Sequence, residues 1–434
     1  MTGLPFPHHS YPPVEERAAA SLRKGFGLVP TKRVERGIRR VDLAYAQLAS
    51  SGIARDINRD VVLELIRGRQ PISRADLSRH SGLQRSTVSL IVEDLLEDGW
   101  IREGAMARLP RGRRPTLLNL NDDLAVLVCD LRPTQAVVAV VDLNGRFLSR
   151  ESLPLISDPA RAVAQIVERM KRLKKKHAQK SFEGIGVSLP GRVDPGSQTL
   201  IFAPNLKWPR FDIGKAIERG VGLKVELDNA ANACLLSELW FGRMDGVRNA
   251  VLVTVSEGIG ASVLANGQLV SGNGGMAGEF GHIPLDPKGP KCACGATGCW
   301  ETLASSTAAL RYYAQLGHNA KRLTMLDLIK LAGEGDAHAN EAIKKQARMI
   351  GRGMRAIMAA VAPEVILVTG DITAAWSRVA PVIEQELASL VLAGPPPRLA
   401  AVEESEVARL RGAAALVLQR HTGRQRARPA RIRI

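Results

Sequence analysis

Three of the chain's five cysteines lie close together, and a histidine precedes them by a short stretch. The cysteines are Cys292, Cys294 and Cys299, and His282 ends the segment GEFGH at residues 278–282. One imidazole and three thiolates, with short loops between them, fit the tetrahedral geometry of Zn²⁺. Because four protein ligands leave no position for a reactive water, we expect the zinc ion to be structural. Free thiols are the alternative.

The other two cysteines and the apolar pattern indicate the compartment. Cys129 lies in an apolar run and Cys234 in a helical pattern, so both are predicted to be small buried hydrophobic residues. An odd number of cysteines with a tight cluster favours metal binding over disulfides. No stretch approaches the roughly 20 apolar residues of a membrane span, and the first residues lack the pattern of a signal peptide. We therefore expect a cytoplasmic protein without membrane insertion.

Positive charge is concentrated at the two ends of the chain. The sequence has 60 basic and 43 acidic residues, a net charge of +17. Residues 1–120 contain 20 basic and 13 acidic residues, and residues 420–434 contain six arginines and no acidic residue. Such an excess suggests a polyanionic partner, with nucleic acid ahead of a membrane surface. A solubilising surface is the alternative.

The hydrophobic pattern divides the chain into four parts. Residues 1–54 are predicted to be a disordered or loosely attached basic arm, and residues 420–434 a flexible basic tail. Residues 55–119 have a compact helical pattern that ends in a basic loop. In residues 120–419 strands alternate with helices, which predicts an α/β domain. Buried strands are expected at 124–131, 136–143, 184–191, 250–256 and 365–370, and helices at 159–177, 229–241, 339–361 and 374–392.

The compact helical part has the pattern of a helix-turn-helix. An amphipathic helix is expected over Asn58–Arg67. Ser73 and Asp76 have the spacing of a capping box that begins a second helix, and Gly82 would end it. A third helix should begin near Gln84 and run to about residue 98. Two short helices joined by a glycine-containing turn are typical of DNA-reading modules. A three-helix protein-binding module is the alternative.

The polar residues of the third helix and the loop after it support DNA reading. The first turns of the helix offer short donors and acceptors, whereas phosphates would repel its acidic last turns, so the N-terminal half should enter the major groove. Residues 99–103 and 116–120 resemble the two strands of a wing. Arginines flank Gly112 in the loop between them, a pattern suited to a narrow A·T minor groove. The predicted DNA contacts are Arg74, Gln84, Arg85, Ser86, Thr87, Ser89, Arg111, Arg113 and Arg114.

Three segments together make the sequence resemble one known family. They are residues 266–279 (NGQLVSGNGGMAGE), 278–282 (GEFGH) and 292–301 (CACGATGCWE). The chain resembles the ROK family of repressors, open reading frames and sugar kinases, and its repressor branch in particular, over most of residues 56–419. The resemblance implies an actin/hexokinase-like domain of two lobes after an N-terminal winged helix-turn-helix domain, which we class as all-α. It also implies a homo-oligomer (dimer or tetramer), zinc on His282 and the three clustered cysteines, and a sugar site between the lobes.

Matching residue by residue, the resemblance places sugar-binding roles on Asn229, Glu279, His282 and Glu301. Sugar hydroxyls both donate and accept hydrogen bonds, so carboxylates and an imidazole can select one stereochemistry. If one ring nitrogen of His282 binds zinc, the other carries a proton that it can donate to a hydroxyl. The metal would also fix Glu301, two residues after Cys299. The alternative is that the two glutamates are surface charges or structural supports.

The residues that a sugar kinase of this family needs are altered here. The first phosphate loop reads DLRPT at residues 130–134, where kinases of the family have glycines, and Pro133 has no N–H to offer. The second loop reads SEGIG at residues 256–260, and Thr369-Gly370-Asp371 replaces the usual paired glycines. Ala230 stands where the kinases have the aspartate that acts as base. A methyl group cannot accept a proton, and such a base typically contributes about 10²–10⁴-fold.

The sequence therefore predicts a sugar-responsive transcriptional regulator with no enzyme activity. Its predicted partners are a double-stranded DNA operator and a sugar or sugar-phosphate effector. As a dimer it should read a palindrome-like operator, because half-sites lie about one helical turn or a multiple apart. It would repress genes of carbohydrate uptake or catabolism. The alternative is an active, ATP-dependent sugar kinase with an autoregulatory DNA-binding module.

Overall fold

The computed structural model describes residues 51–106, 115–194, 196–203, 206, 208–209, 211–242, 244, 246–389 and 395–419. These residues belong to one compact unit that begins at Ser51. Nearly all of the predicted basic arm and the whole predicted basic tail lie outside the described residues, as do Arg111, Arg113 and Arg114. No helix of the described residues is long and apolar enough to cross a membrane.

The first described part, residues 51–120, contains the expected helix-turn-helix and wing strands. Ser73 caps α2, since its side chain accepts a hydrogen bond from the backbone of Asp76, and Gly82 ends the helix in the left-handed conformation. The helix α1 begins at Ser51, earlier than predicted. The elements are α1 (Ser51–Arg69), β1 (Ile72–Ser73), α2 (Arg74–Ser81), α3 (Arg85–Glu97), β2 (Ile101–Met106) and β3 (Thr116–Leu120).

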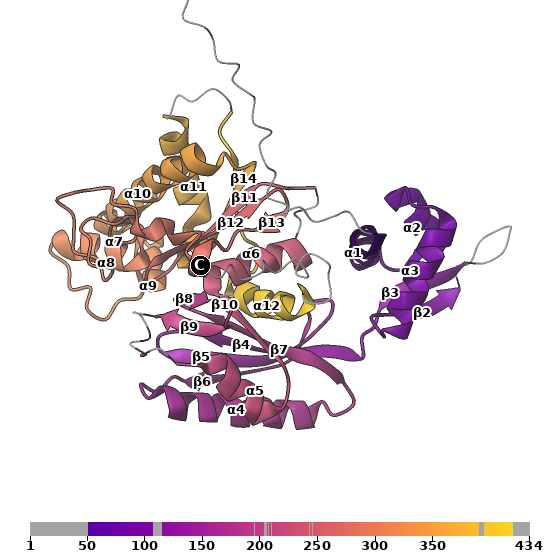
Figure 1. The fold of residues 1–434 in the computed structure, drawn as a ribbon. Coiled ribbons are helices and arrows are strands. Elements are labelled where there is room, and N and C mark those ends of the chain that lie inside the picture. The colour runs from indigo at the N-terminus through magenta and orange to yellow at the C-terminus, as the bar shows by residue number, and fades with distance from the viewer. Residues whose placement is uncertain are drawn as a thin grey trace, which may run out of the picture. The chain divides into compact units, whose positions relative to one another are not determined.

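The remaining described residues form two lobes, each built on a five-stranded sheet (Figure 1). In both sheets three consecutive strands pair antiparallel and two later strands add in parallel beside the first of them. The order β10-β7-β4-β5-β6 in the first lobe thus corresponds to β15-β14-β11-β12-β13 in the second. The strands are β4 (Leu124–Leu131), β5 (Gln135–Asp142), β6 (Phe147–Pro154), β7 (Ser181–Leu189), β10 (Val225–Asn229), β11 (Ala250–Val255), β12 (Ile259–Ala265), β13 (Gln268–Leu269), β14 (Val365–Gly370) and β15 (Arg398–Ala401). The lobes therefore repeat one topology, as in actin-like folds.

Two helices, α6 (Ala230–Phe241) and α12 (Ser405–Leu418), pack against each other between the sheets (Figure 1). The helix α12 also contacts β4 and β7 of the first lobe, and α6 contacts β11 and β12 of the second. A Cβ atom at Gly412 would lie 1.7 Å from the backbone oxygen of Ala233, so only glycine permits this close approach. The helix pair thus joins the two lobes.

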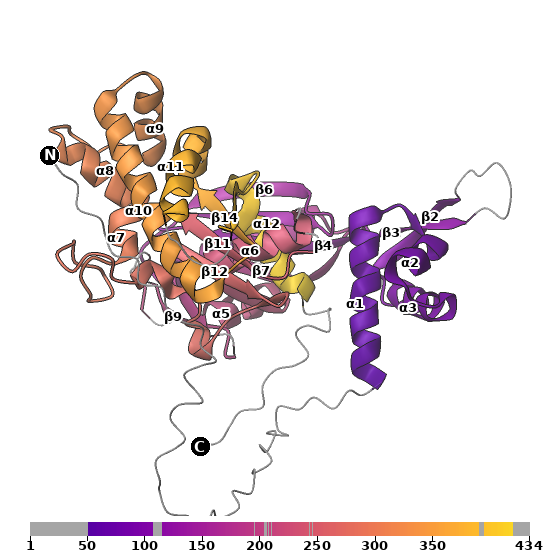
Figure 2. The same ribbon diagram turned by 90° about the horizontal axis from the view of Figure 1, so that it is seen from above.

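Other helices cover the outer faces of the sheets. In the first lobe these are α4 (Pro159–Lys176) and α5 (Ile213–Val221). Figure 2 shows α10 and α11 side by side in the second lobe, and the two helices are in contact. The second-lobe helices are α7 (Trp300–Ala304), α8 (Ser306–Gln315), α9 (Met325–Gly333), α10 (Ala337–Val361) and α11 (Trp376–Ala388). Shorter elements are β8 (Arg192–Asp194), β9 (Thr199–Phe202), η2 (Asn273–Gly275), η3 (Glu279–His282) and η4 (Asp371–Ala375).

The predicted fold class, an α/β domain of two lobes after a winged helix-turn-helix, is confirmed. The four helices and five strands predicted for residues 120–419 all occur, with ends shifted by a few residues. Sequence analysis did not single out α5 or α12. The helix α12 is buried on several sides, so apolar residues occur all round it. The alternation of apolar and polar residues that identifies an amphipathic helix in a sequence is therefore weak in α12.

Candidate functional site

The four residues predicted to bind zinc lie together. One ligand atom from each of His282, Cys292, Cys294 and Cys299 falls within 4.8 Å of all the others. The Cys292 sulfur is 3.5 Å from Nδ1 of the histidine, and the sulfurs of Cys294 and Cys299 are 3.6 Å apart. Ligands bound to tetrahedral zinc are roughly 3.5–3.8 Å from one another, given the usual bond lengths. The donor set and its spacing therefore fit a closed zinc site.

Local contacts hold the two halves of this cluster in place. The short helix η3 carries His282 and packs against β12. Its N-cap residue, Gly278, lies so close to β12 that a Cβ atom there would be 2.3 Å from the backbone oxygen of Ala261. Cys299 is the N-cap residue of α7. The next residue, Trp300, is fully buried, and its indole N–H donates to the backbone oxygen of Met349 at 2.9 Å. The packing of Trp300 thus fixes both Cys299 and the first turn of α7.

The two ring nitrogens of His282 face different partners. Nδ1 is the atom close to the Cys292 sulfur, whereas Nε2 is 3.5 Å from a carboxylate oxygen of Glu279. Glu301, on the first turn of α7, lies 3.5 Å from Nδ1. If Nδ1 binds the metal, Nε2 carries the ring proton and can donate it to a neighbouring acceptor. A cysteine of the cluster and two acidic side chains therefore meet at one imidazole.

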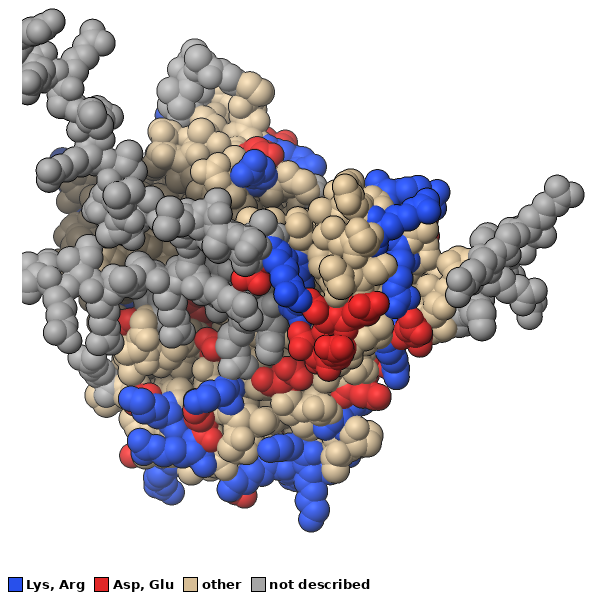
Figure 3. Space-filling view, turned by 45° about the vertical axis from the view of Figure 1, so that its right-hand side comes forward, with Lys and Arg blue, Asp and Glu red and all other residues tan. Residues whose placement is uncertain are grey.

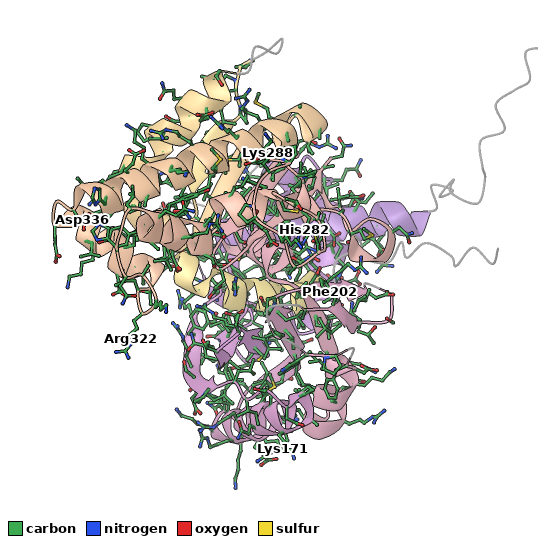
Figure 4. All side chains as sticks on the ribbon, turned by 90° about the vertical axis from the view of Figure 1, so that its left-hand side faces the viewer. Lys171, Phe202, His282, Lys288, Arg322 and Asp336 are labelled. Atoms are coloured by element: carbon green, nitrogen blue, oxygen red, sulfur yellow. The ribbon has the colours of Figure 1, made fainter. Side chains whose placement is uncertain are left out.

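All four residues predicted to bind a sugar line one cavity of about 420 Å³, a volume typical of small-molecule sites. Figure 4 labels His282 and Phe202, which both border this cavity. Asn229 is the N-cap residue of α6, and its side-chain oxygen accepts from the backbone N–H of Asn232 at 2.8 Å. That bond leaves the amide N–H groups of Asn229 as donors for a ligand. Burial raises the pKa of the Glu279 carboxyl above its usual value.

The cavity also has lining residues that sequence analysis missed. Arg192 and Phe202 come from the β8–β9 hairpin, Met276 from the loop before η3, and Arg409 from α12. Nothing in their sequence context distinguishes them, because they reach the cavity from separate elements. Ala230, the position to which the family resemblance assigns the base of the kinases, lines the cavity.

A second cavity, of about 740 Å³, lies next to the first and shares Thr254, Ser256 and Arg409 with it. It includes the altered loop residues Arg132, Glu257 and Asp371. Burial raises the pKa of the Asp371 carboxyl, and the nearby Glu257 raises it further. The carboxyl groups of Glu257 and Asp371 share this wall with the guanidinium groups of Arg132 and Arg409.

The fully buried Asp130 at the end of β4 is paired with arginine. The Arg132 side chain turns back and donates to one of its oxygens at 2.7 Å, and Arg409 lies 3.9 Å from the other. Arg132 therefore compensates the charge of an internal carboxylate.

Of the predicted DNA-reading residues in the described part of the chain, Arg74 begins α2 and the others lie at the start of α3. Gln84, Arg85 and Ser86 are exposed, and Thr87 and Ser89 are half-buried. Arg74 is half-buried and forms an ion pair with Glu103 at 2.9 Å. Sequence analysis missed Leu90, which is 62% exposed on the same helix and could contact a thymine methyl group.

The acidic end of α3 is partly neutralised from α1. Arg55 pairs with Asp94 and Arg59 pairs with Asp98, both at 2.5 Å. These pairs fix α3 to α1 and leave the N-terminal half of α3 as the part suited to DNA. Figure 3 shows basic and acidic side chains gathered in separate patches on one face of the molecule.

Comparison with known proteins identifies the class. The ROK family profile matches residues 127–420, and a winged helix-turn-helix DNA-binding profile matches residues 56–102. The chain belongs to the ROK family. It is 30% identical over 348 residues to the xylose repressor of Bacillus subtilis (strain 168). The matched region covers 79% of this chain and 90% of that protein.

Two further relatives point the same way. The DNA-binding transcriptional dual regulator NagC of Escherichia coli (strain K12) is 27% identical over 355 residues, 78% of this chain and 86% of that protein. The crystal structure of a ROK family transcriptional regulator, a homologue of the E. coli MLC protein, matches with a TM-score of 0.74 and 27% identity, covering 86% of this chain and 98% of that one. The predicted family, its repressor branch and the predicted class of function, a DNA-binding transcriptional regulator, are confirmed.

Proposed function

We propose that this chain is a cytoplasmic, sugar-responsive regulator that represses genes of carbohydrate uptake or catabolism. The observation that carries the proposal is the cavity in which Asn229, Glu279, His282 and Glu301 meet, in a chain that begins with a DNA-reading module. The relatives named xylose repressor and NagC support it. The proposed division is a basic arm (1–54), whose last four residues already belong to α1, a winged helix-turn-helix (55–119), a sensor domain (120–419) and a basic tail (420–434).

The sensor domain is proposed to bind a sugar without phosphorylating it. Three features support this: the methyl group of Ala230 at the place of the base, the pairing of Arg132 with Asp130, and the presence of Glu257 and Asp371 in the second cavity. The alternative, an active sugar kinase with an autoregulatory module, would require another base. A phosphorylation assay with ATP and a panel of sugars distinguishes the two.

Zinc is proposed to be structural. The three thiolates and the imidazole would hold it, and it would supply a fixed link between η3 and α7, the elements that carry Glu279 and Glu301. The chain's own residues would contact the sugar. The two glutamates would accept hydrogen bonds from its hydroxyls, and His282 and Asn229 would donate to it.

DNA binding is proposed to use a dimer and a palindrome-like operator, with the start of α3 in the major groove and Arg111, Arg113 and Arg114 in the minor groove. Arg85 and Ser86 are exposed as such a role requires. Arg74 would have to exchange its partner Glu103 for DNA, so we expect it to contribute less than Arg85.

The helix α6 offers a route between the sugar and DNA. It begins at the cavity with Asn229 and ends near Trp240, whose ring lies under the Arg67 guanidinium of α1 at 5.3 Å. Arg67 also donates to the backbone oxygen of Leu239 at 3.1 Å. A sugar that favours one arrangement of the lobes would shift α6, and with it α1. Such couplings are typically about 1–3 kcal/mol, or roughly 5–150-fold in affinity.

Calorimetry tests the proposal. The full chain is titrated with candidate sugars, with and without operator DNA, and linkage requires the operator to change sugar affinity by the same factor as the sugar changes operator affinity. Glu301→Ala should abolish sugar binding while sugar-free DNA binding persists; the exposed Glu334→Ala is the control. Zinc content is measured in both variants. If Glu301→Ala with full zinc still responds to the same sugar at the same concentration, the sensor site is wrongly placed.

A further inference from the structure

Two large apolar side chains are exposed at the proposed sugar cavity. Phe202 and Met276 both line it, and they are 47% and 57% exposed. Single exposed hydrophobic residues are common on protein surfaces. Two that border one ligand cavity, beside groups suited to hydroxyls, mark a surface for contact with the ligand. The two side chains therefore indicate that the ligand has an apolar face to cover.

The β8–β9 hairpin places Arg192 beside Phe202. The two residues are direct partners in the antiparallel pairing of the strands. Opposite residues of such a pair project from the same face, so the guanidinium group and the aromatic ring start side by side. The preceding Gly191 has φ of +119°, and a Cβ atom there would lie 2.3 Å from the backbone oxygen of Phe202. The tight closure of the hairpin thus fixes the position from which both side chains extend.

Arg192 offers a hydrogen bond to a ligand but no surplus charge. Its charge interacts with that of Glu279 in the same cavity. Its Nε is buried and has no hydrogen-bond partner within the described part of the chain. A buried donor without an acceptor is unfavourable, and a neutral hydroxyl is a sufficient acceptor. An uncharged ligand with a hydroxyl group near the hairpin would therefore satisfy this side chain.

Met276 reaches the same region from the second lobe. It directly follows η2, and η2 contacts β8 of the hairpin. The unbranched methionine side chain adapts readily to the shape of a bound group. Arg192, Phe202 and Met276 thus form one region of the cavity, which we call the outer subsite.

The outer subsite has the chemistry of a sugar-binding surface. A sugar ring has apolar C–H faces and hydroxyl groups around its edge, so it can stack on an aromatic ring while one hydroxyl accepts from a nearby donor. An alkyl or aryl substituent would also cover Phe202, but it would leave the Nε of Arg192 without a partner. The cavity volume of about 420 Å³ falls in the range of drug-sized ligands, so the ligand is not limited to one ring.

We propose that the effector of this protein is a disaccharide. One ring would be held by the four predicted sugar-binding residues, and the second ring would stack on Phe202 and accept a hydrogen bond from Arg192. This inference rests on the proposed sugar-sensing function and adds the size and chemical class of the ligand. The outer subsite would then determine specificity, because a monosaccharide leaves it empty.

Matched sugar sets test the proposal by calorimetry on the full, zinc-loaded chain. Xylose, glucose, galactose and N-acetylglucosamine are each compared with disaccharides that contain the same ring: xylobiose, cellobiose and maltose, lactose, and chitobiose. The nitrophenyl glycosides of the same sugars probe an apolar substituent without hydroxyl groups. In at least one set a disaccharide should bind about tenfold tighter than its monosaccharide.

Variants then locate the preference. Phe202→Ala should weaken disaccharide binding about tenfold, and at least fivefold more than it weakens monosaccharide binding, whereas Phe202→Tyr keeps the aromatic face and should keep the preference. Arg192→Lys keeps a charge beside Glu279 but has no Nε, so it should lose part of the preference. Leu316→Ala is the control, since Leu316 is 41% exposed at the end of α8, outside the cavity. Far-ultraviolet circular dichroism and zinc content verify folding.

Three results would overturn the inference and leave the proposed function standing. The first is a monosaccharide that binds as tightly as its disaccharides and changes DNA affinity. The second is a gain in affinity for a nitrophenyl glycoside but for no disaccharide, which would make the outer subsite a site for an apolar substituent. The third is an equal loss of monosaccharide and disaccharide affinity in Phe202→Ala, which would mean that Phe202 helps to close the lobes. If no sugar of any set binds the folded, zinc-loaded chain, both the inference and the proposed function fail.

Discussion

The contact between Trp300 and α10 allows the proposed zinc and sugar sites to be perturbed from a distance. A Cβ atom at Gly353 would lie 2.1 Å from Trp300 Cε2, far inside van der Waals contact. The indole is fully buried and bonded to the Met349 oxygen, so it has little freedom to move aside. Overpacking of this kind costs about 1–3 kcal/mol, and the clash places Gly353→Ala at the upper end. The better helix propensity of alanine returns about 0.5–1 kcal/mol.

We therefore expect Gly353→Ala to destabilise the sensor domain by about 2 kcal/mol. Its thermal midpoint should fall by roughly 4–8 °C, since each kcal/mol shifts a domain of this size by about 2–4 °C. Because Trp300 lies between Cys299 and Glu301, zinc retention and sugar affinity should fall together. Gly333→Ala is the control, since its Cβ would meet only the end of the Arg378 side chain at 3.2 Å. A Gly353→Ala protein with wild-type midpoint, zinc content and sugar affinity would refute the reasoning.

Three further predictions concern the metal, the wing and the coupling. Cys294→Ala should lose bound zinc and the sugar response, and it should create no core cavity because Cys294 is exposed. Metal analysis checks this prediction, and a metal-free variant that still responds to sugar would contradict it. Arg113→Ala should weaken operator binding most where A·T pairs flank the site, and an equal loss on all flanks would mean contact with phosphate only. Arg67→Met should leave sugar affinity unchanged but reduce the effect of the sugar on operator affinity at least threefold. An unchanged coupling factor would exclude this contact as the route.

The metal cluster shows what could be predicted from sequence. Its ligands lie within one short segment, so their spacing restricts the geometry before any long-range contact is considered. The helix-turn-helix was predictable for the same reason. The Ser73 cap, the Gly82 turn and the buried positions of α3 are set by neighbours a few residues away.

The sugar cavity needed more than local pattern. Family resemblance, not spacing, assigned Asn229 to the same site as Glu279 and Glu301. The fold brings them together because the end of β10, η3 and the start of α7 all line one cavity. Arg192 and Arg409 were missed, since each comes from an element whose distance to the cavity depends on the packing of the lobes. The ion pairs of Arg55 and Arg59 with the acidic end of α3 were missed likewise.

The sequence by itself determined the local features: the cluster of one histidine and three cysteines, the capped helices and the buried strands. Tertiary structure decided how charges are matched. Arg132 could have faced a ligand, but the fold turns it onto the buried Asp130 at 2.7 Å, and it brings Arg192 close enough to Glu279 for their charges to interact. The physical reason is that the free energy of a buried charge depends on what lies within a few ångströms of it, and residues far apart in the chain supply those neighbours.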